Sequence, residues 1–184
     1  MTTVESIYQN ILLKLKNDQR PYLVLTSEEV SSLLTLLECS SDISEQKKIL
    51  CIFQYAKPQS CVTSEFFLQF LEKNIQRAKE EILVDSLIVT QNNIIDYFQN
   101  RGEGVPPKYL ELLNACLHFS NSQIVHWALR LIAHLGREKK YFEQQIKDIY
   151  PSFWAMIFSS QKRENAKLIH YINNAMKGSP WNPR

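Results

Sequence analysis

Glycine is scarce in this sequence, with four residues in 184, at positions 102, 104, 136 and 178. None of them builds the Gly-rich loop with which nucleotide-binding proteins hold phosphate, and the GxSxG, HExxH and protein-kinase motifs are also missing. Strict alternation of polar and apolar residues, the pattern of a half-buried strand, does not occur either. These absences argue against a β-rich fold and against the common hydrolase, metalloprotease and kinase classes, so we expect a protein that is not an enzyme.

The four cysteines, Cys39, Cys51, Cys61 and Cys116, form no CxxC pair, and no histidine stands at zinc-ligand spacing from them. Cysteines without a pairing pattern are typical of a reducing compartment. The first residues lack the basic and apolar regions of a signal peptide, and no apolar run approaches the ~20 residues of a membrane span. We therefore expect a cytoplasmic protein that binds no metal and no cofactor.

Proline and glycine fall at the edges of segments whose apolar residues repeat with helical spacing. Capping-box pairs, in which a Thr and the Glu three positions later bond each other's backbone, open two of these segments, at Thr2 with Glu5 and at Thr26 with Glu29. The segments predict helices over about residues 3–17, 26–39, 43–57, 63–77, 78–99, 106–119, 123–135, 141–149 and 164–176, with a further short one from Pro151. Gly136 should end the helix over 123–135 as a C′ residue.

The segments together predict an all-α fold with about eight or nine helices. We expect a single domain over residues 1–177, because this length suits one hydrophobic core. Residues 178–184 have no periodicity, and they form a tail that is either frayed or docked through Trp181.

Two helix pairs share one residue pattern. The segment Leu33-Leu34-x-x-Leu37-x-x-x-Ser41 matches Leu112-Leu113-x-x-Cys116-x-x-x-Ser120, and the helices that follow align at the same offset of 79 residues. That offset equals two units of roughly 40 residues, the length of common helical repeats. One helix pair cannot bury its apolar face alone, so such units stack against their neighbours. An irregular helical bundle would show the same amphipathic segments and stays open as an alternative.

The stretch from Tyr109 to Gly136, YLELLNACLHFSNSQIVHWALRLIAHLG, resembles a HEAT or armadillo-type repeat. It has a leucine-rich first helix, a short Ser/Asn turn, and a second helix with Val, Ala-Leu and a closing Leu-Gly. Residues 27–57 resemble the same unit more loosely. The resemblance implies a short right-handed α-α superhelix in which the second helix of each pair lines the concave face.

Basic side chains form a narrow stripe on one of these second helices. His126, Arg130 and His134 are spaced at i, i+4 and i+8, so they lie on one face of a helix that is otherwise almost wholly apolar. His126 and His134 are separated by about 12 Å along the helix axis, which is too far for a shared metal ion. The offset of 79 residues extends the stripe to Lys47, Cys51 and Tyr55, and an offset of 40 extends it to Ala166, His170 and Asn174. The predicted binding residues on this stripe are Lys47, Tyr55, His126, Arg130, His134, His170 and Asn174.

The charge is distributed unevenly along the chain. Residues 1–92 carry 9 Lys and Arg against 12 Asp and Glu, and residues 93–184 carry 12 against 7. We therefore interpret the chain as a non-catalytic scaffold that binds a protein or peptide, with an acidic partner favoured by the basic half. Two alternatives stay open. One is nucleic-acid binding, in the manner of the DNA glycosylases built from HEAT-like repeats, although the net charge of +2 argues against it. The other is an enzyme with a shallow site near His118, His126 or His170.

Overall fold

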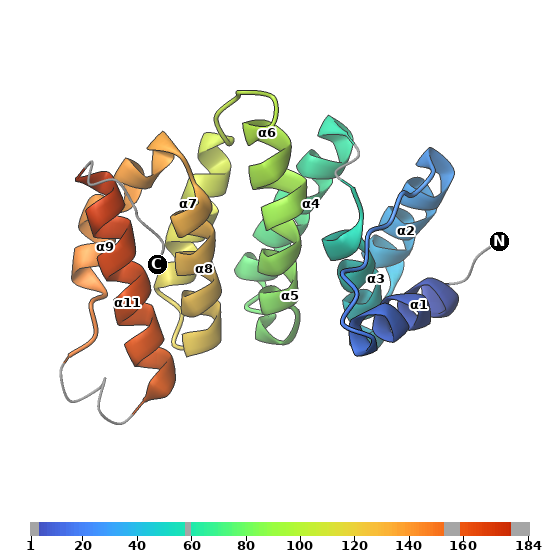
Figure 1. Cartoon of the computed structure of the whole chain (residues 1–184), viewed down its shortest axis with the longest axis horizontal. Coiled ribbons are helices and arrows are strands. Elements are labelled where there is room, and N and C mark those ends of the chain that lie inside the picture. Colours follow the sequence, from blue (N-terminus) through green and yellow to red (C-terminus); the bar gives the residue numbers. More distant parts are fainter. Residues whose placement is uncertain (1–3, 58–59, 153–158, 178–184) are drawn as a thin grey trace. The chain divides into compact units, whose positions relative to one another are not determined.

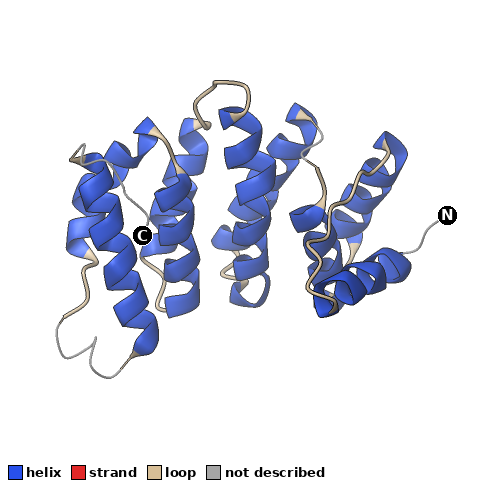
Figure 2. Cartoon of the chain, viewed as in Figure 1, coloured by secondary structure: helices blue, strands red, loops and turns tan. Residues whose placement is uncertain are grey.

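A computed structural model describes residues 4–57, 60–152 and 159–177 of the chain. All regular secondary structure in these ranges is helical (Figure 2), and the one pairing of extended backbone is an isolated parallel bridge between Leu23 and Ala56. The prediction of an all-α fold is confirmed. The chain divides into two compact units, Met1–Tyr97 and Phe98–Arg184, which are described in turn.

The first unit contains two successive helix pairs, preceded by one more helix. Its elements are α1 (Val4–Lys16), α2 (Ser27–Cys39), α3 (Ile43–Tyr55), α4 (Cys61–Gln76), α5 (Glu80–Thr90) and η1 (Gln91–Asp96), and α6 (Tyr97–Gln99) follows at the boundary. Helix α5 packs against both α3 and α4, while α1 and α2 pack against α3 (Figure 1). The second helices of the two pairs, α3 and α5, are therefore neighbours, as in a stack of helix pairs.

The core of the first unit lies between these helices. Phe53 of α3 meets Phe67 of α4 edge to face, with ring centroids 5.1 Å apart, a favourable geometry for aromatic pairs. The same unit contains further side chains that are almost completely buried: Ile11, Leu37, Ile49, Leu50, Ile52, Leu71, Ile82, Leu83 and Leu87. They are the apolar residues whose helical spacing was evident in the sequence.

The second unit repeats the pairing with α7 (Pro107–Leu117) and α8 (Ser122–His134). It continues with η2, a 3₁₀ helix (Arg137–Phe142), α9 (Glu143–Asp148) and α11 (Ser160–Met176). Helix α8 packs against α7 on one side and most extensively against α11 on another, and α8 and α11 run in the same direction (Figure 1). We call the solvent-facing surface of these two helices the α8–α11 face; it carries His126, Arg130 and His134 on α8 and His170 and Asn174 on α11.

The helix starts agree closely with the capping residues of the sequence. The Thr26–Glu29 capping box is present, with the Thr26 N–H donating to Glu29 Oε2 over 2.8 Å. Asp42 caps α3, and Pro107 occupies the first turn of α7. Helix α4 begins at Cys61 rather than 63 or 64, because Ser60 is its N-cap. The other predicted box, at Thr2, lies outside the described residues.

Three local predictions need comment. The long helix over 78–99 widens at Gln91–Asp96 into a π-helix, so it is not a regular α-helix throughout. The helix over 141–149 begins as the 3₁₀ segment η2. Gly136 follows α8 at the C′ position, but its φ of −75° is not the left-handed conformation expected of a C′ glycine. The short helix predicted from Pro151 and the docking of Trp181 concern residues that the structure does not describe.

Candidate functional site: the α8–α11 face

Helix α8 places the predicted basic stripe at the surface because its opposite side is wholly apolar. Asn121 caps the helix by accepting a hydrogen bond from the Gln123 N–H over 3.0 Å. Buried along its inner side are Ile124, Ala128, Leu129, Leu131 and Ile132. Burial of these residues fixes the rotation of the helix, so the polar stripe cannot turn inward without exposing the core. The outward positions are left to His126, Arg130 and His134.

His126 joins α8 to α11. Its Nδ1 lies 2.9 Å from Asn165 Oδ1, and Asn165 is itself buried. The offset of 40 residues aligned Ala166 with His126 as the equivalent position on the stripe, but Ala166 is buried in the core with 7% of its surface exposed. The hydrogen bond with Asn165 holds the imidazole at the seam between the helices and limits its freedom to bind a ligand.

Arg130 is the most available charged group of the stripe. Its guanidinium lies over the ring of Trp127, 4.4 Å from the ring centroid, and the residue is exposed. Within the described part of the chain, no carboxylate forms an ion pair with it. Stacking on an indole reduces the number of conformations open to the arginine while its hydrogen-bond donors stay free at the edge of the plane.

The remaining predicted residues of this unit lie further along the two helices. His170 and Asn174 are both exposed and one turn apart on α11, with Asn174 Nδ2 3.0 Å from His170 Nε2. His134 is exposed at the last turn of α8, where its backbone carbonyl accepts a hydrogen bond from Gln99. The structure therefore brings five of the seven predicted residues onto two adjacent helices. Trp127 and Asn165 complete the face and were not among the predicted residues.

Lys47 and Tyr55 lie in the first unit, on α3. Lys47 Nζ is 3.8 Å from Asp85 Oδ2 of the neighbouring helix α5, so the charge of the predicted basic stripe is balanced there. Burial raises the pKa of Asp85 above its ordinary value, and the charge of Lys47 opposes that shift. Tyr55 is half-buried, and burial followed by the nearby Cys51 raises the pKa of its hydroxyl. Asp85 was missed although it is the one charged residue between Ile82 and Ile95, a signal available in the sequence.

Among the described residues, no group of three or more His, Cys, Asp or Glu side chains is arranged to hold a metal ion. Within the same part of the chain, no helix has the length and apolar content required to cross a membrane.

Comparison with known proteins adds no relative: no family model, curated protein or solved structure matches the chain. The fold defines its class as an all-helical protein, and the resemblance to HEAT and armadillo repeats stays a prediction.

Proposed function

We propose that this protein is a non-catalytic interaction module that binds an acidic protein segment on the α8–α11 face. The observation that supports the proposal is the exposed Arg130 guanidinium, stacked on Trp127 and without a carboxylate partner among the described residues. Arginine and tryptophan are the residue types that contribute most often to the energetic centres of protein interfaces. A planar guanidinium binds a carboxylate through two parallel hydrogen bonds.

The charge of the second unit favours the same class of partner. Residues 98–184 carry 12 Lys and Arg against 6 Asp and Glu, whereas residues 1–97 carry 9 against 13. Lys162, Arg163 and Lys167 are exposed on α11, the helix that packs most extensively against α8. A segment with Glu or Asp beside apolar residues could pair with Arg130 while its apolar side chains cover Trp127.

The test is a titration of the full chain with a helical peptide of Glu and Leu, followed by nuclear magnetic resonance. The indole N–H signal of Trp127, assigned from a Trp127→Phe variant, should shift and saturate. Arg130→Glu should weaken binding about a hundredfold, because it replaces a pairing charge with a repelling one. Arg130→Lys should weaken it about fivefold, since an ammonium keeps the charge but loses the paired hydrogen bonds.

Arg77→Glu provides the matched control. It makes the same change of charge at an exposed position at the end of α4, in the first unit and outside the α8–α11 face. If Arg130→Glu and Arg77→Glu weaken binding equally, the attraction is a general effect of net charge and the assignment of the α8–α11 face fails.

Nucleic acid is the alternative partner for a basic face. Phosphate contacts make such binding strongly salt-dependent. Tight binding of duplex DNA by the full chain at 150 mM salt, abolished by Arg130→Glu and with no peptide binding, would replace the proposed function with that alternative.

A further inference from the structure

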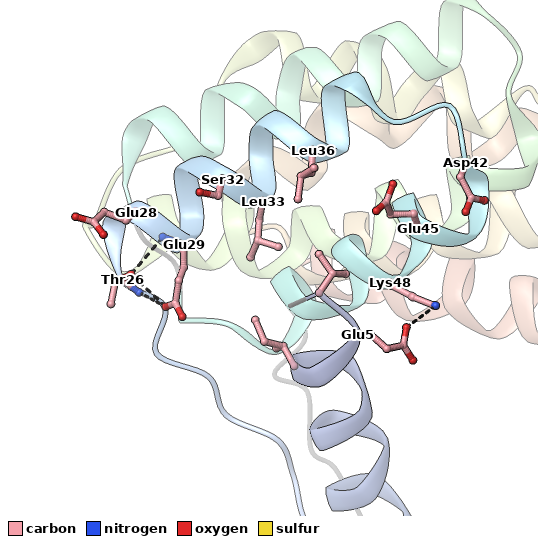
Figure 3. A pocket seen from close by; sticks show the side chains of 12 residues that line it. Glu5, Thr26, Glu28, Glu29, Ser32, Leu33, Leu36, Asp42, Glu45 and Lys48 are labelled. Carbon is pink, nitrogen blue, oxygen red and sulfur yellow. Dashed lines mark hydrogen bonds and ion pairs between the residues drawn. The ribbon is translucent and has the colours of Figure 1, made fainter. Parts of the chain in front are cut away.

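The first unit has a groove of about 830 Å³ bounded by α1, α2 and the beginning of α3 (Figure 3). Its apolar lining consists of Val4 and Ile7 from α1 and Leu33 and Leu36 from α2. Leu33 and Leu36 point from α2 toward the beginning of α1 in Figure 3. Leu33 is buried, but 42% of Leu36 is exposed, so the groove offers apolar surface that no described part of the chain covers.

Carboxylates surround this apolar surface. Five acidic residues line the groove against a single cation, Lys48, and they are Glu5, Glu28, Glu29, Asp42 and Glu45. Four of them are held by the fold. Glu29 accepts hydrogen bonds in the capping box, Asp42 caps α3 by accepting from the Ser44 N–H over 2.8 Å, and Glu45 accepts from the Ser40 hydroxyl over 2.6 Å.

Glu5 is held by an ion pair with Lys48, with the charged atoms 2.7 Å apart. The hydrogen bond from Lys48 is the chief cause of the lowered pKa of Glu5. Lys48 is thereby engaged with one carboxylate, so it neutralises only part of the negative charge of the five acidic residues. The groove combines an apolar floor with a net negative rim in which four of the five carboxylates are held in position.

We infer that this groove binds a basic amphipathic helix of a partner protein, with apolar side chains on Leu33 and Leu36 and with Lys or Arg side chains on the carboxylate rim. The spacing supports a helix. Val4 and Ile7 on one wall, and Leu33 and Leu36 on the other, are each three residues apart, so both walls present apolar side chains about one turn apart. An amphipathic helix presents its own apolar side chains at the same interval.

Charge complementarity determines the sign of the charge that the partner must carry. An acidic helix would place like charges against five carboxylates, whereas Lys and Arg can extend their apolar stems over the floor and carry their charges to the rim. The groove is thus a second binding site, opposite in charge to the α8–α11 face and independent of the function proposed for it.

The probe is a fluorescent amphipathic helical peptide of Leu and Lys, titrated with the full chain and followed by anisotropy. The control peptide has the same composition in a scrambled order that spreads the leucines around the helix. We expect the amphipathic peptide to bind at least tenfold more tightly than the scrambled one.

Leu36→Glu separates this groove from simple charge attraction. It adds a carboxylate, which would strengthen a purely electrostatic attraction, but it should weaken binding at least tenfold because it removes apolar contact. Leu13→Glu is the matched control, because Leu13 is 60% exposed on α1 outside the groove lining and should leave binding within twofold. Glu28→Lys should weaken binding about fivefold, and Glu65→Lys, at an exposed position of α4, should have little effect.

Several results would overturn the inference. Equal binding of the two peptides would mean attraction without a groove, and equal effects of Leu36→Glu and Leu13→Glu would place the binding elsewhere. Concentration-dependent dimerisation in sedimentation, removed by Leu36→Glu, would identify a second copy of the chain as the occupant. Arg130→Glu should leave this peptide bound, so a failure of the α8–α11 proposal would not be mistaken for a failure of this one.

Discussion

Asn93 in the π-helix η1 should be among the most sensitive polar positions of the first unit. Its amide Nδ2 donates to Phe53 O over 3.3 Å and to Val89 O over 3.0 Å, and the residue is 1% exposed. Asn93→Ala removes both hydrogen bonds, each worth about 1 kcal/mol net, and leaves a buried carbonyl of α3 without that donor. The expected loss in the free energy of unfolding is therefore about 2–3 kcal/mol.

Urea unfolding of the full chain, followed by circular dichroism, measures this loss. Asn10→Ala is the matched control, since Asn10 is exposed on α1 and its replacement should change stability by less than about 0.5 kcal/mol. Asn93→Asp keeps the shape but turns the donor into an acceptor facing two carbonyls, so it should destabilise more than Asn93→Ala at pH 7. Equal stability of Asn93→Ala and Asn10→Ala would refute the role given to Asn93.

The melting temperature of Asn93→Ala carries a second piece of information. A loss of 1 kcal/mol lowers the melting temperature by about 4–8 °C in a unit of up to 100 residues, but by about 2–4 °C in a chain of 150–250 residues. A fall of about 10 °C or more, confined to part of the transition, would indicate that residues 1–97 unfold as their own cooperative unit.

Three further outcomes follow from single side chains. Burial raises the pKa of Asp85, so the folded chain binds that proton more tightly than the unfolded chain and loses stability as the pH rises through the raised pKa. Asp85→Asn should therefore increase the free energy of unfolding at pH 7, by an amount that shrinks toward pH 4, in urea titrations at several pH values. Burial raises the pKa of the Cys116 thiol to about 12, so a thiol reagent at pH 8 should modify the exposed Cys39 and Cys61 first and reach Cys116 only in denaturant. Thr26→Ala removes the side-chain cap of α2 and should cost about 1 kcal/mol in the same unfolding assay.

The sequence by itself determined where most helices begin and which side of each is buried. Capping is a contact within one turn, so the start of a helix can be predicted from its capping residues without reference to the rest of the chain. This holds for Thr26 with Glu29 at α2, for Asp42 at α3 and for Pro107 at α7. Helical periodicity is equally local, and it identified the buried side of α8 together with the exposed positions of Arg130 and His134.

Only the tertiary structure decided how α3 ends and where the helix that begins with α5 widens into η1. The carbonyls at the end of α3 and at its C-cap Ala56 accept hydrogen bonds from the Leu23 N–H and from the side chains of Asn92 and Asn93, more than 30 residues away in the sequence. Such donors cannot be assigned from local patterns, since an asparagine in a helix is ordinarily exposed. The π-helix at Gln91–Asp96 carries both asparagines.

The same distinction applies to the binding surfaces. Spacing placed His126 at the surface, but its partner Asn165, the pairing of Lys47 with Asp85, and the groove between α1 and α2 depend on which helices pack together. Packing is set by the fit of side chains over long sequence separations, so the repeat spacing that aligned Ala166 with His126 did not indicate that Asn165 contacts His126. Local periodicity fixed the polar side of α8, and the packing of α11 against α8 determined what lies beside it.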